Sequence, residues 1–243
     1  MATENTQNKT TEGIGREEEI YRKRFSDGQE NTRSVTWRVL MNRFFQPRIA
    51  ADSVVVDIGA GDGLFIKNIV ARKRIAVDLS PHVKALESDG IEVHVKPATV
   101  FSTCISEPAD VIFMSNFLEH LPTKQLVLDV LDECLKALKP GGVVMILQPN
   151  IRYVGPAYWD YIDHHIALTE HSLVEALNIS GFSVKELIPR FLPYTAKSKV
   201  GLLAGTFPEA IVKLYLNMPI LWRFFGQQTF IVGQKKGEIK DIL

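Results

Sequence analysis

The stretch that decides the fold is Val-Val-Val-Asp-Ile-Gly-Ala-Gly-Asp-Gly, residues 54–63. Its valines predict a short strand buried on both faces of a parallel sheet, because such strands read as continuous β-branched runs. The glycines then permit a tight turn that a residue with a Cβ makes only at a cost. From Leu64 the apolar residues (Phe65, Ile66, Ile69 and Val70) are spaced as in a helix. A strand, a glycine turn and a helix N-terminus together predict a site for a small polar ligand at the edge of a sheet.

The spacing of the glycines indicates which ligand the turn takes. The dinucleotide fingerprint G-x-G-x-x-G has its third glycine three residues after the second. Here Gly63 follows Gly61 by two residues, and Leu64 stands where the fingerprint has glycine. The acid before the turn, Asp57, would repel a pyrophosphate and attract an ammonium or sulfonium group. A nicotinamide-dependent oxidoreductase is therefore disfavoured, although a Rossmann-like domain with another ligand remains an alternative.

A second acid follows the next predicted strand. Residues 75–77 are a short apolar run, and Asp78 comes directly after it. Asp78 lies about twenty residues beyond the turn region, where an acidic group can accept hydrogen bonds from both ribose hydroxyls. The sequence therefore predicts two carboxylates at the ends of neighbouring parallel strands.

These segments resemble the class I S-adenosylmethionine-dependent methyltransferases. Residues 56–63 match the first motif of that family, and residues 76–80 match the second. Residues 109–121 resemble its fourth strand with the following loop, and residues 138–147 resemble the turn into its fifth strand. The resemblance implies an α/β fold of the Rossmann-like type, with a seven-stranded, mostly parallel sheet and an antiparallel last strand. It also implies S-adenosyl-L-methionine as the cofactor.

The resemblance further implies which residues hold the cofactor. Asp57 and the glycine turn are expected at its methionine end, and Asp78 at its ribose. Ser115 and Asn116, after the fourth strand, are expected close to the sulfonium through backbone oxygens. The expected cofactor-binding residues are Asp57, Gly59, Ala60, Gly61, Gly63, Asp78, Leu79, Ala98, Thr99, Ser115 and Asn116.

The loop expected beside the adenine departs from the family pattern. Many relatives carry an acid there, which accepts from the adenine amino group, but residues 96–102 contain none. Backbone groups of Ala98 and Thr99, or the Thr99 hydroxyl, would have to take this role.

Candidate catalytic groups form two clusters after the fourth and fifth strands. An oxygen nucleophile must lose its proton before or during methyl transfer, and histidine is the commonest general base. His164 or His165, next to Asp163, is the preferred base, with His120 as a further catalytic candidate. The alternative is an ordinary polar loop in which one histidine caps the nearby helix. The clusters are Ser115, Asn116, Glu119 and His120, and Trp159, Asp160, Tyr161, Asp163, His164 and His165.

The pair Glu119-His120 is also similar to part of a magnesium site of some relatives, which consists of a Glu-x-x-Glu-His element and a distant histidine. Here Asn116 stands at the first position, and its amide is a poorer ligand for a hard cation than a carboxylate. No metal site is therefore expected, and the pair is interpreted as fastening its loop. His171 is expected in the first turn of a helix, without a catalytic role.

Composition bounds the class of protein. The 243 residues are enough for one large α/β domain with extensions, and a net charge of zero gives no broad attraction to nucleic acid or anionic membrane. Cys104 and Cys134 fall in apolar segments and are interpreted as reduced core thiols. The sequence shows neither an apolar signal region nor an integral membrane segment, so a cytoplasmic protein is expected.

The chain divides into a predicted disordered tail over residues 1–15, a helical segment over 16–50 and a methyltransferase domain over 51–243. Helices expected at residues 16–25 and 32–45 would close over the cofactor as a lid or simply cover the sheet. Arg24 and Arg33 are candidates for holding the cofactor's carboxylate. Further helices are expected after caps at Ser80, Thr123 and Thr169, with Gly141 as a left-handed C-cap.

An aromatic insert over residues 190–225 is longer than a plain connection needs. It is interpreted as a helical cap that shapes an apolar acceptor pocket. A core-completing helix pair, a homodimer interface and a membrane-surface contact are the alternatives, the last disfavoured because the basic residues are few.

The predicted function is transfer of a methyl group to a small-molecule or sugar-bearing acceptor, including a glycan or lipid-linked one, at oxygen. N-methylation is the nearest alternative. A cofactor-binding, non-catalytic homologue that acts as a partner protein is another, disfavoured because Asp57 and Asp78 are both retained.

Overall fold

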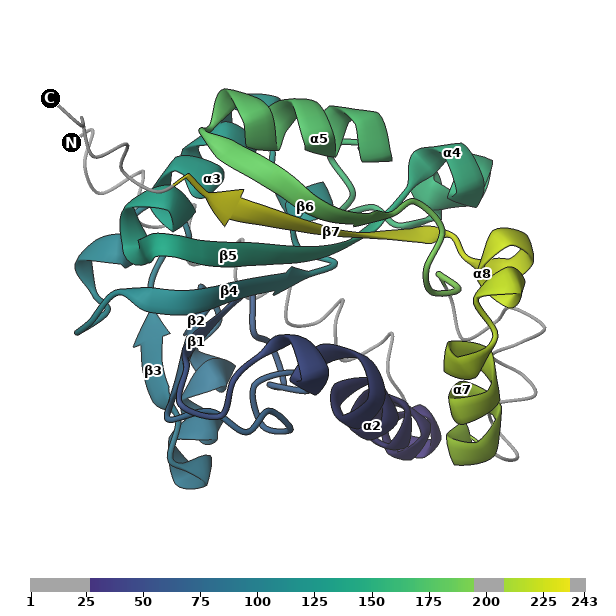
Figure 1. Ribbon diagram of the computed structural model, residues 1–243, viewed down its shortest axis with the longest axis horizontal. Helices are drawn as coiled ribbons and strands as arrows, with labels where there is room; N and C mark the ends of the chain where they lie inside the picture. The colour runs from purple at the N-terminus through teal and green to yellow at the C-terminus, as the bar shows by residue number, and fades with distance from the viewer. Residues whose placement is uncertain (1–26, 195–207, 237–243) are drawn as a thin grey trace, which may run out of the picture.

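The computed structural model describes residues 27–194 and 208–236 and has a seven-stranded sheet at its centre (Figure 1). The strand order is β3-β2-β1-β4-β5-β7-β6, with β7 antiparallel to both of its neighbours and the other pairs parallel. This is the α/β, Rossmann-like sheet implied by the sequence. The strands are β1 Val54–Ile58, β2 Lys73–Asp78, β3 Glu92–Val95, β4 Ala109–Ser115, β5 Leu138–Pro149, β6 Phe182–Ile188 and β7 Gln228–Lys235.

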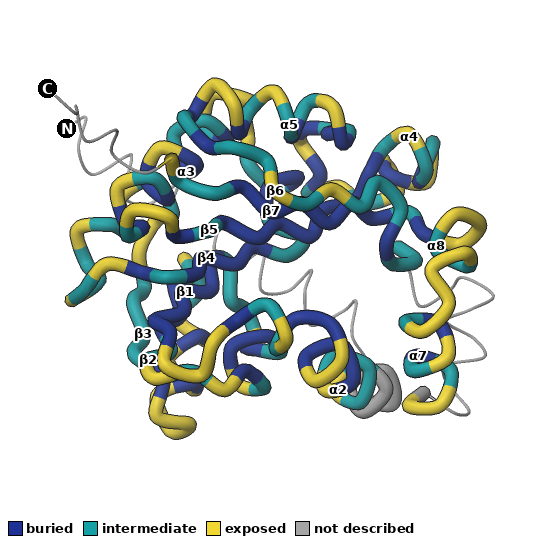
Figure 2. Tube along the Cα trace, in the orientation of Figure 1, coloured by how far each residue is buried: buried dark blue, intermediate teal, exposed yellow. Residues whose placement is uncertain are grey.

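β1 lies between β2 and β4, and all five of its residues are buried. Successive side chains of β1 pack on opposite faces of the sheet. Val54 and Val56 belong to the core beneath α3 (Lys124–Ala137) and α5 (Glu170–Ile179). Val55 belongs to the core on the opposite face. Burial on both faces explains why this strand begins with three consecutive valines (Figure 2).

The opposite face is covered by the N-terminal helix and the insert. α2 (Asp27–Leu40) continues into a π-turn, Met41–Phe45, and a 3-10 turn, Gln46–Arg48. α7 (Pro208–Asn217) lies beside α2, and α8 (Pro219–Phe225) leads back into β7. The expected helix over 16–25 and Arg24 lie outside the described residues, as does the tail over 1–15.

The expected N-caps are present at three helices. The Thr123 side chain accepts from the backbone N–H of Leu126, and Thr169 forms a capping box with Ser172. Ser80 caps Pro81–Asp89, which is a 3-10 rather than an α-helix. Short polar side chains thus satisfy the first backbone donors of each helix.

The helix expected directly after the glycine turn is absent. The chain from residue 64 to 68 forms consecutive turns, and Val70 is 63% exposed. The side chain of Gln46 explains this, since its Oε1 accepts from Val70 N at 2.7 Å and its Nε2 donates to Val70 O at 3.0 Å. These two bonds fix the backbone of Val70 outside a helix, while Phe65 and Ile66 still reach the core.

The expected glycine C-cap at Gly141 is also absent. α3 ends at Ala137, and Leu138 already starts β5 by pairing with Ala109. The carbonyls of Leu135 and Leu138 accept instead from the ammonium of Lys235, each at 2.7 Å. A cation thus satisfies the end of this helix in place of a left-handed glycine.

Both cysteines are free thiols. Cys134 is buried in the core, where burial raises the pKa of its thiol. Cys104 is only half-buried, so its interpretation as a core thiol is wrong. Within the described ranges, no helix has both the length and the apolar character needed to cross a bilayer.

Candidate active site

The turn after β1 requires glycine. Gly59, Gly61 and Gly63 have φ values of +68°, +50° and +72°, in the left-handed region. A Cβ on Gly59 would lie 2.6 Å from Cδ2 of Phe117, and one on Gly63 would lie 2.6 Å from Cδ2 of Leu86. The N–H of Gly59 donates to Val77 O at 2.9 Å, which holds the turn against the end of β2.

The two predicted acids meet at this edge. Asp57 is 3% exposed, and burial together with the neighbouring charge of Asp78 raises its pKa, although the N–H of Ile66 acts in the opposite direction. Asp78 accepts from Gly61 N at 2.9 Å through Oδ2 and from Ser80 N at 2.8 Å through Oδ1. Asp78 therefore joins the glycine turn to the end of β2.

The loop expected near the adenine lies beside Asp78. The N–H of Lys96 donates to Asp78 O at 3.0 Å, so the chain after β3 begins next to the acid. Ala98 and Thr99 are half-buried in this loop, and Leu79 is 49% exposed. These residues therefore border the same edge as the glycine turn.

The end of β4 carries an unusual backbone. Asn116 has φ +47°, the single positive value among the non-glycine residues that the structure describes. Its N–H donates to Leu147 O at 2.9 Å, and its Nδ2 donates to Ser115 Oγ at 3.1 Å. Residues held in this sparsely populated region cluster at functional sites. The next residue, Phe117, contacts the glycine turn, so Ser115 and Asn116 lie near it.

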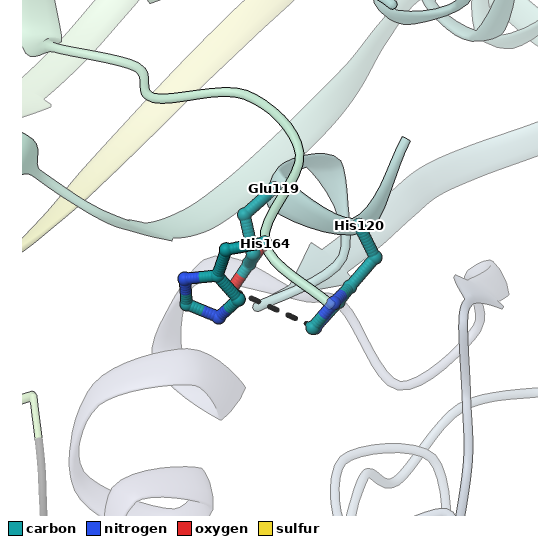
Figure 3. Close-up of side chains that lie close together, drawn as sticks. All are labelled: Glu119, His120 and His164. Atoms are coloured by element: carbon teal, nitrogen blue, oxygen red, sulfur yellow. Dashed lines mark ion pairs between the residues drawn. The ribbon is translucent and has the colours of Figure 1, made fainter. Parts of the chain in front are cut away.

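Three further side chains meet beyond this strand end (Figure 3). Glu119 and His120 lie in the 3-10 turn Leu118–His120, and His164 follows the 3-10 turn Gly155–Asp160. One ligand atom of each lies within 4.8 Å of the others. We call Glu119, His120 and His164 the Glu-His-His cluster.

Glu119 is the buried member of the cluster, at 1% exposure. Its Oε2 accepts from Nε2 of Gln148 at 2.9 Å. Burial raises the pKa of Glu119, against the opposing effects of His120 and Gln148. Gln148 was not among the predicted site residues, although a polar residue after the apolar run of β5 is a signal that could have found it.

His120 is oriented from one side of its ring. Nδ1 lies 3.0 Å from Asp163 O and 3.4 Å from Asp163 Oδ2. Nε2 lies 4.0 Å from Oε1 of Glu119, and the His120 side chain is 34% exposed. One ring nitrogen thus has a partner on the loop, while the other faces the carboxylate.

His164 is enclosed by tyrosines. Its ring centroid lies 4.7 Å from that of Tyr158 and 5.1 Å from that of Tyr161. Tyr194 Oη lies 3.4 Å from Nε2 of His164 and brings the start of the insert to the cluster. No sequence signal pointed to Tyr158 as a neighbour of the site.

Other predicted residues lie outside the Glu-His-His cluster itself. His165 is exposed, and its backbone N–H donates to Glu119 O at 2.9 Å. Arg33 forms an ion pair with Asp62 at 3.6 Å, which joins α2 to the glycine turn. His171 lies in the first turn of α5 with a side chain that is 75% exposed.

A family model described as a methyltransferase domain matches residues 30–187, well over half of the chain. The chain belongs to the class I S-adenosylmethionine-dependent methyltransferases. The matched range includes the glycine turn, both acids and the Glu-His-His cluster. The cofactor of the family, and of this enzyme, is S-adenosylmethionine.

Solved structures share the fold of this methyltransferase. A SAM-dependent methyltransferase from Archaeoglobus fulgidus has a TM-score of 0.58 and 19% identity, covering 82% of this chain and 92% of that chain. The N-methyltransferase NodS from Bradyrhizobium japonicum, in complex with S-adenosyl-L-homocysteine, has a TM-score of 0.56 and 13% identity, covering 93% and 98%. A complex of the Haloferax volcanii Trm112 methyltransferase activator with a methyltransferase gives a TM-score of 0.59 and 16% identity, covering 86% and 95%. The search of curated proteins gave no match.

The acids of the methyltransferase fit the chemistry of its cofactor. Each oxygen of Asp78 takes one backbone N–H, and a carboxylate oxygen offers two acceptor positions, so both can accept from a ribose hydroxyl. The buried charge of Asp57 beside Asp78 is unfavourable alone, and a nearby cationic group would offset it. The two carboxylates therefore suit a ligand with a positive centre and two neighbouring hydroxyls.

Proposed function

We propose that this enzyme methylates a hydroxyl oxygen of a small-molecule or sugar-bearing acceptor. The Glu-His-His cluster is the observation that carries the proposal, because it follows the β4 end at which Asn116 adopts its strained backbone. An oxygen nucleophile must release a proton, and imidazole and carboxylate groups are suited to receive it. A neutral amine needs no such group before attack, so the cluster favours oxygen over nitrogen.

Residues on the two strand ends would position the cofactor. We assign Asp57 and the glycine turn to its methionine end and Asp78 to the ribose. Ala98 and Thr99 would border the adenine, and Asn116 the sulfonium. When bound, S-adenosylmethionine supplies an electrophilic methyl group, so the protein mainly aligns the partners and manages one proton.

The surroundings of the cluster support an acceptor with an apolar or ring-shaped part. Tyr161 stacks on His164, and Tyr194 reaches the same ring from the insert. Trp159 and Ile162, 54% and 84% exposed, lie on the same connection after β5. Aromatic side chains of this kind bind sugar rings and apolar chains through their faces. The insert would accordingly form one wall of the acceptor site.

The test combines cofactor binding with product analysis. Calorimetry should detect S-adenosylhomocysteine binding, and Asp78→Ala should weaken it. Acceptor candidates would then be screened by mass spectrometry for a methyl group on oxygen. The double variant His164→Ala with His165→Ala should abolish turnover and retain cofactor binding, whereas His171→Ala, an exposed histidine, should retain both.

Two results would reject the proposal in different ways. A methyl group found on nitrogen, with full activity in the double histidine variant, would favour N-methylation. Tight cofactor binding without turnover on any acceptor, combined with a stable complex with another protein, would favour a non-catalytic partner.

A further inference from the structure

We propose that the Glu-His-His cluster binds a divalent transition-metal ion of the Zn²⁺, Mn²⁺ or Co²⁺ class. The proposal deepens the proposed function and rests on it, since the ion would bind the acceptor hydroxyl. It revises the expectation of no metal site, which considered Asn116 and a hard cation. The structure shows which distant histidine meets the pair: it is His164, on a connection 44 residues farther along the chain than His120.

The spacing of the three ligands is close to that of a metal site. Their ligand atoms lie within 4.8 Å of one another, with His120 Nε2 and Glu119 Oε1 at 4.0 Å. Bonds of about 2.0–2.2 Å in a tetrahedral site would place ligand atoms about 3.4 Å apart. Small side-chain rotations would close this difference, since the three side chains already lie close together (Figure 3).

A second layer of contacts orients two of the ligands as metal sites require. A histidine ligand commonly donates its other ring N–H to a carbonyl or carboxylate, which fixes the tautomer. His120 Nδ1 has Asp163 O at 3.0 Å, so Nε2 is left to face Glu119. Gln148 holds Oε2 of Glu119 at 2.9 Å, so Oε1 is left for the ion. A polar loop without a ligand needs neither arrangement.

The donor set indicates the class of metal. Two imidazoles and one carboxylate suit first-row transition metals, whereas Mg²⁺ and Ca²⁺ prefer oxygen ligands throughout. Three protein ligands leave at least one coordination position open. The His120 side chain is 34% exposed, so this member of the cluster is open to solvent.

With an ion at this position, the three side chains would promote loss of the acceptor's proton through the ion, in place of receiving the proton themselves. A coordinated hydroxyl has a lower pKa than a free one, because the cation stabilises the oxyanion. The O–H bond breaks and its proton passes to solvent, the new bond forms between oxygen and the methyl carbon, and the carbon–sulfur bond breaks. The sulfur keeps that electron pair and leaves as a neutral thioether, so no oxidant or reductant is needed.

Metal binding can be measured without knowing the acceptor. The full-length chain, treated with EDTA and dialysed, would be titrated with ZnCl₂ by calorimetry and with Co²⁺ by visible absorption. We expect one ion per chain and much weaker binding of Mg²⁺. Replacement of a direct ligand, Glu119→Gln or His164→Ala, should weaken Zn²⁺ binding about 100-fold, and Gln148→Leu, which removes only the second-layer bond to Glu119 Oε2, about 10-fold.

A matched control exists in the same chain. Glu170 and His171 repeat the Glu-His pair at the start of α5, where Glu170 is buried and His171 is exposed, with His171 Nε2 3.5 Å from Glu170 Oε1. His171→Ala should leave Zn²⁺ binding unchanged. A ratio below one ion per chain, equal loss in His171→Ala, or Mg²⁺ binding as tight as Zn²⁺ would overturn the proposal.

Titration of the same preparations with S-adenosylhomocysteine separates this proposal from the methyltransferase function. Retained cofactor binding shows that a variant is folded, so its loss of Zn²⁺ affinity belongs to the metal site. Cofactor binding without Zn²⁺ binding in the unmodified chain would overturn the metal site alone. Absence of cofactor binding would instead reject the cofactor assignment.

Discussion

Single residues in the turn after β1 decide whether the cofactor site can form. Gly59 combines φ +68° with a direct approach to the ring of Phe117. The first property disfavours any side chain, and the second leaves no space for one. The strained Asn116 lies next to Phe117 in the chain, so the two strand ends are packed against each other across this contact.

Gly59→Ala should therefore weaken S-adenosylhomocysteine binding at least 10-fold, because the turn or Phe117 must shift to admit the Cβ. Calorimetry measures the affinity. Gly90→Ala is the matched control, since Gly90 has φ +69° but its added Cβ would have only Arg74 Nη2 nearby, at 4.0 Å. Its left-handed strain should cost about 1–2 kcal/mol of stability and leave the affinity unchanged. Equal affinities in both variants would contradict this account of the turn.

At the scale of elements, one buried carboxylate joins α3 to the 3-10 turn Phe101–Thr103. Glu133 is 6% exposed, and its Oε2 accepts from Ser102 Oγ at 2.5 Å and from Ser102 N at 3.2 Å. Burial alone would raise the pKa of Glu133, but the hydrogen bonds from Lys136 and Ser102 outweigh burial, and the net pKa is lowered. The charged form is thus favoured by the folded state.

Because the folded-state pKa is lowered, Glu133 stabilises the fold above its unfolded pKa, and this contribution is lost as the pH falls through the folded value. Glu133→Gln should cost about 1–2 kcal/mol in the free energy of unfolding at pH 7. Below pH 4, urea unfolding should show a smaller difference in the free energy of unfolding between the unmodified protein and Glu133→Gln. Glu175→Gln, on the exposed surface of α5, should leave the free energy of unfolding unchanged at both pH values. A difference that stays constant with pH would contradict the role of the charge.

The elements differ in how far sequence could predict them. The strand Val54–Ile58 could be predicted because burial on both faces selects consecutive valines, which the sequence shows directly. The turn over residues 64–68 was not, because Gln46, far away in the chain, fixes the backbone of Val70. Periodicity records which residues are buried and does not record such a distant hydrogen bond. For the same reason the end of α3 could not be deduced without Lys235.

The candidate site likewise contains residues whose proximity could be predicted from the sequence and residues whose proximity could not. The two acids and the glycines are close in sequence or follow neighbouring strands, so their meeting could be predicted. The Glu-His-His cluster depends on the connection after β5, whose path is set by the tyrosines around His164. Sequence named each histidine but could not decide which would meet, and it favoured His165 equally with His164.

On the scale of the whole molecule, the N-terminal helix, the sheet and the insert share one aromatic core. Phe44, after α2, lies 4.1 Å from Phe191 and 5.0 Å from Phe230 of β7, measured between ring centroids. Phe191 also contacts Trp222 of α8 at 5.1 Å, and its carbonyl accepts from Tyr215 Oη at 2.6 Å. The insert is thus part of the folded core as well as a neighbour of the site.

Phe191→Ala should consequently destabilise the protein by about 3–5 kcal/mol, because it empties a fully buried position shared by three elements. Hydrogen exchange should show faster opening of α2 and α7 than of the central strands, since both helices depend on this cluster. α2 also contacts the glycine turn through Arg33 and Asp62, so S-adenosylhomocysteine affinity should fall as well.

Phe224→Ala is the control, because Phe224 is 69% exposed and its loss should change neither stability nor affinity. If Phe191→Ala instead left exchange in α2 untouched, the insert and the N-terminal helix would be energetically independent, and coupling between the acceptor wall and the cofactor turn would have no physical basis.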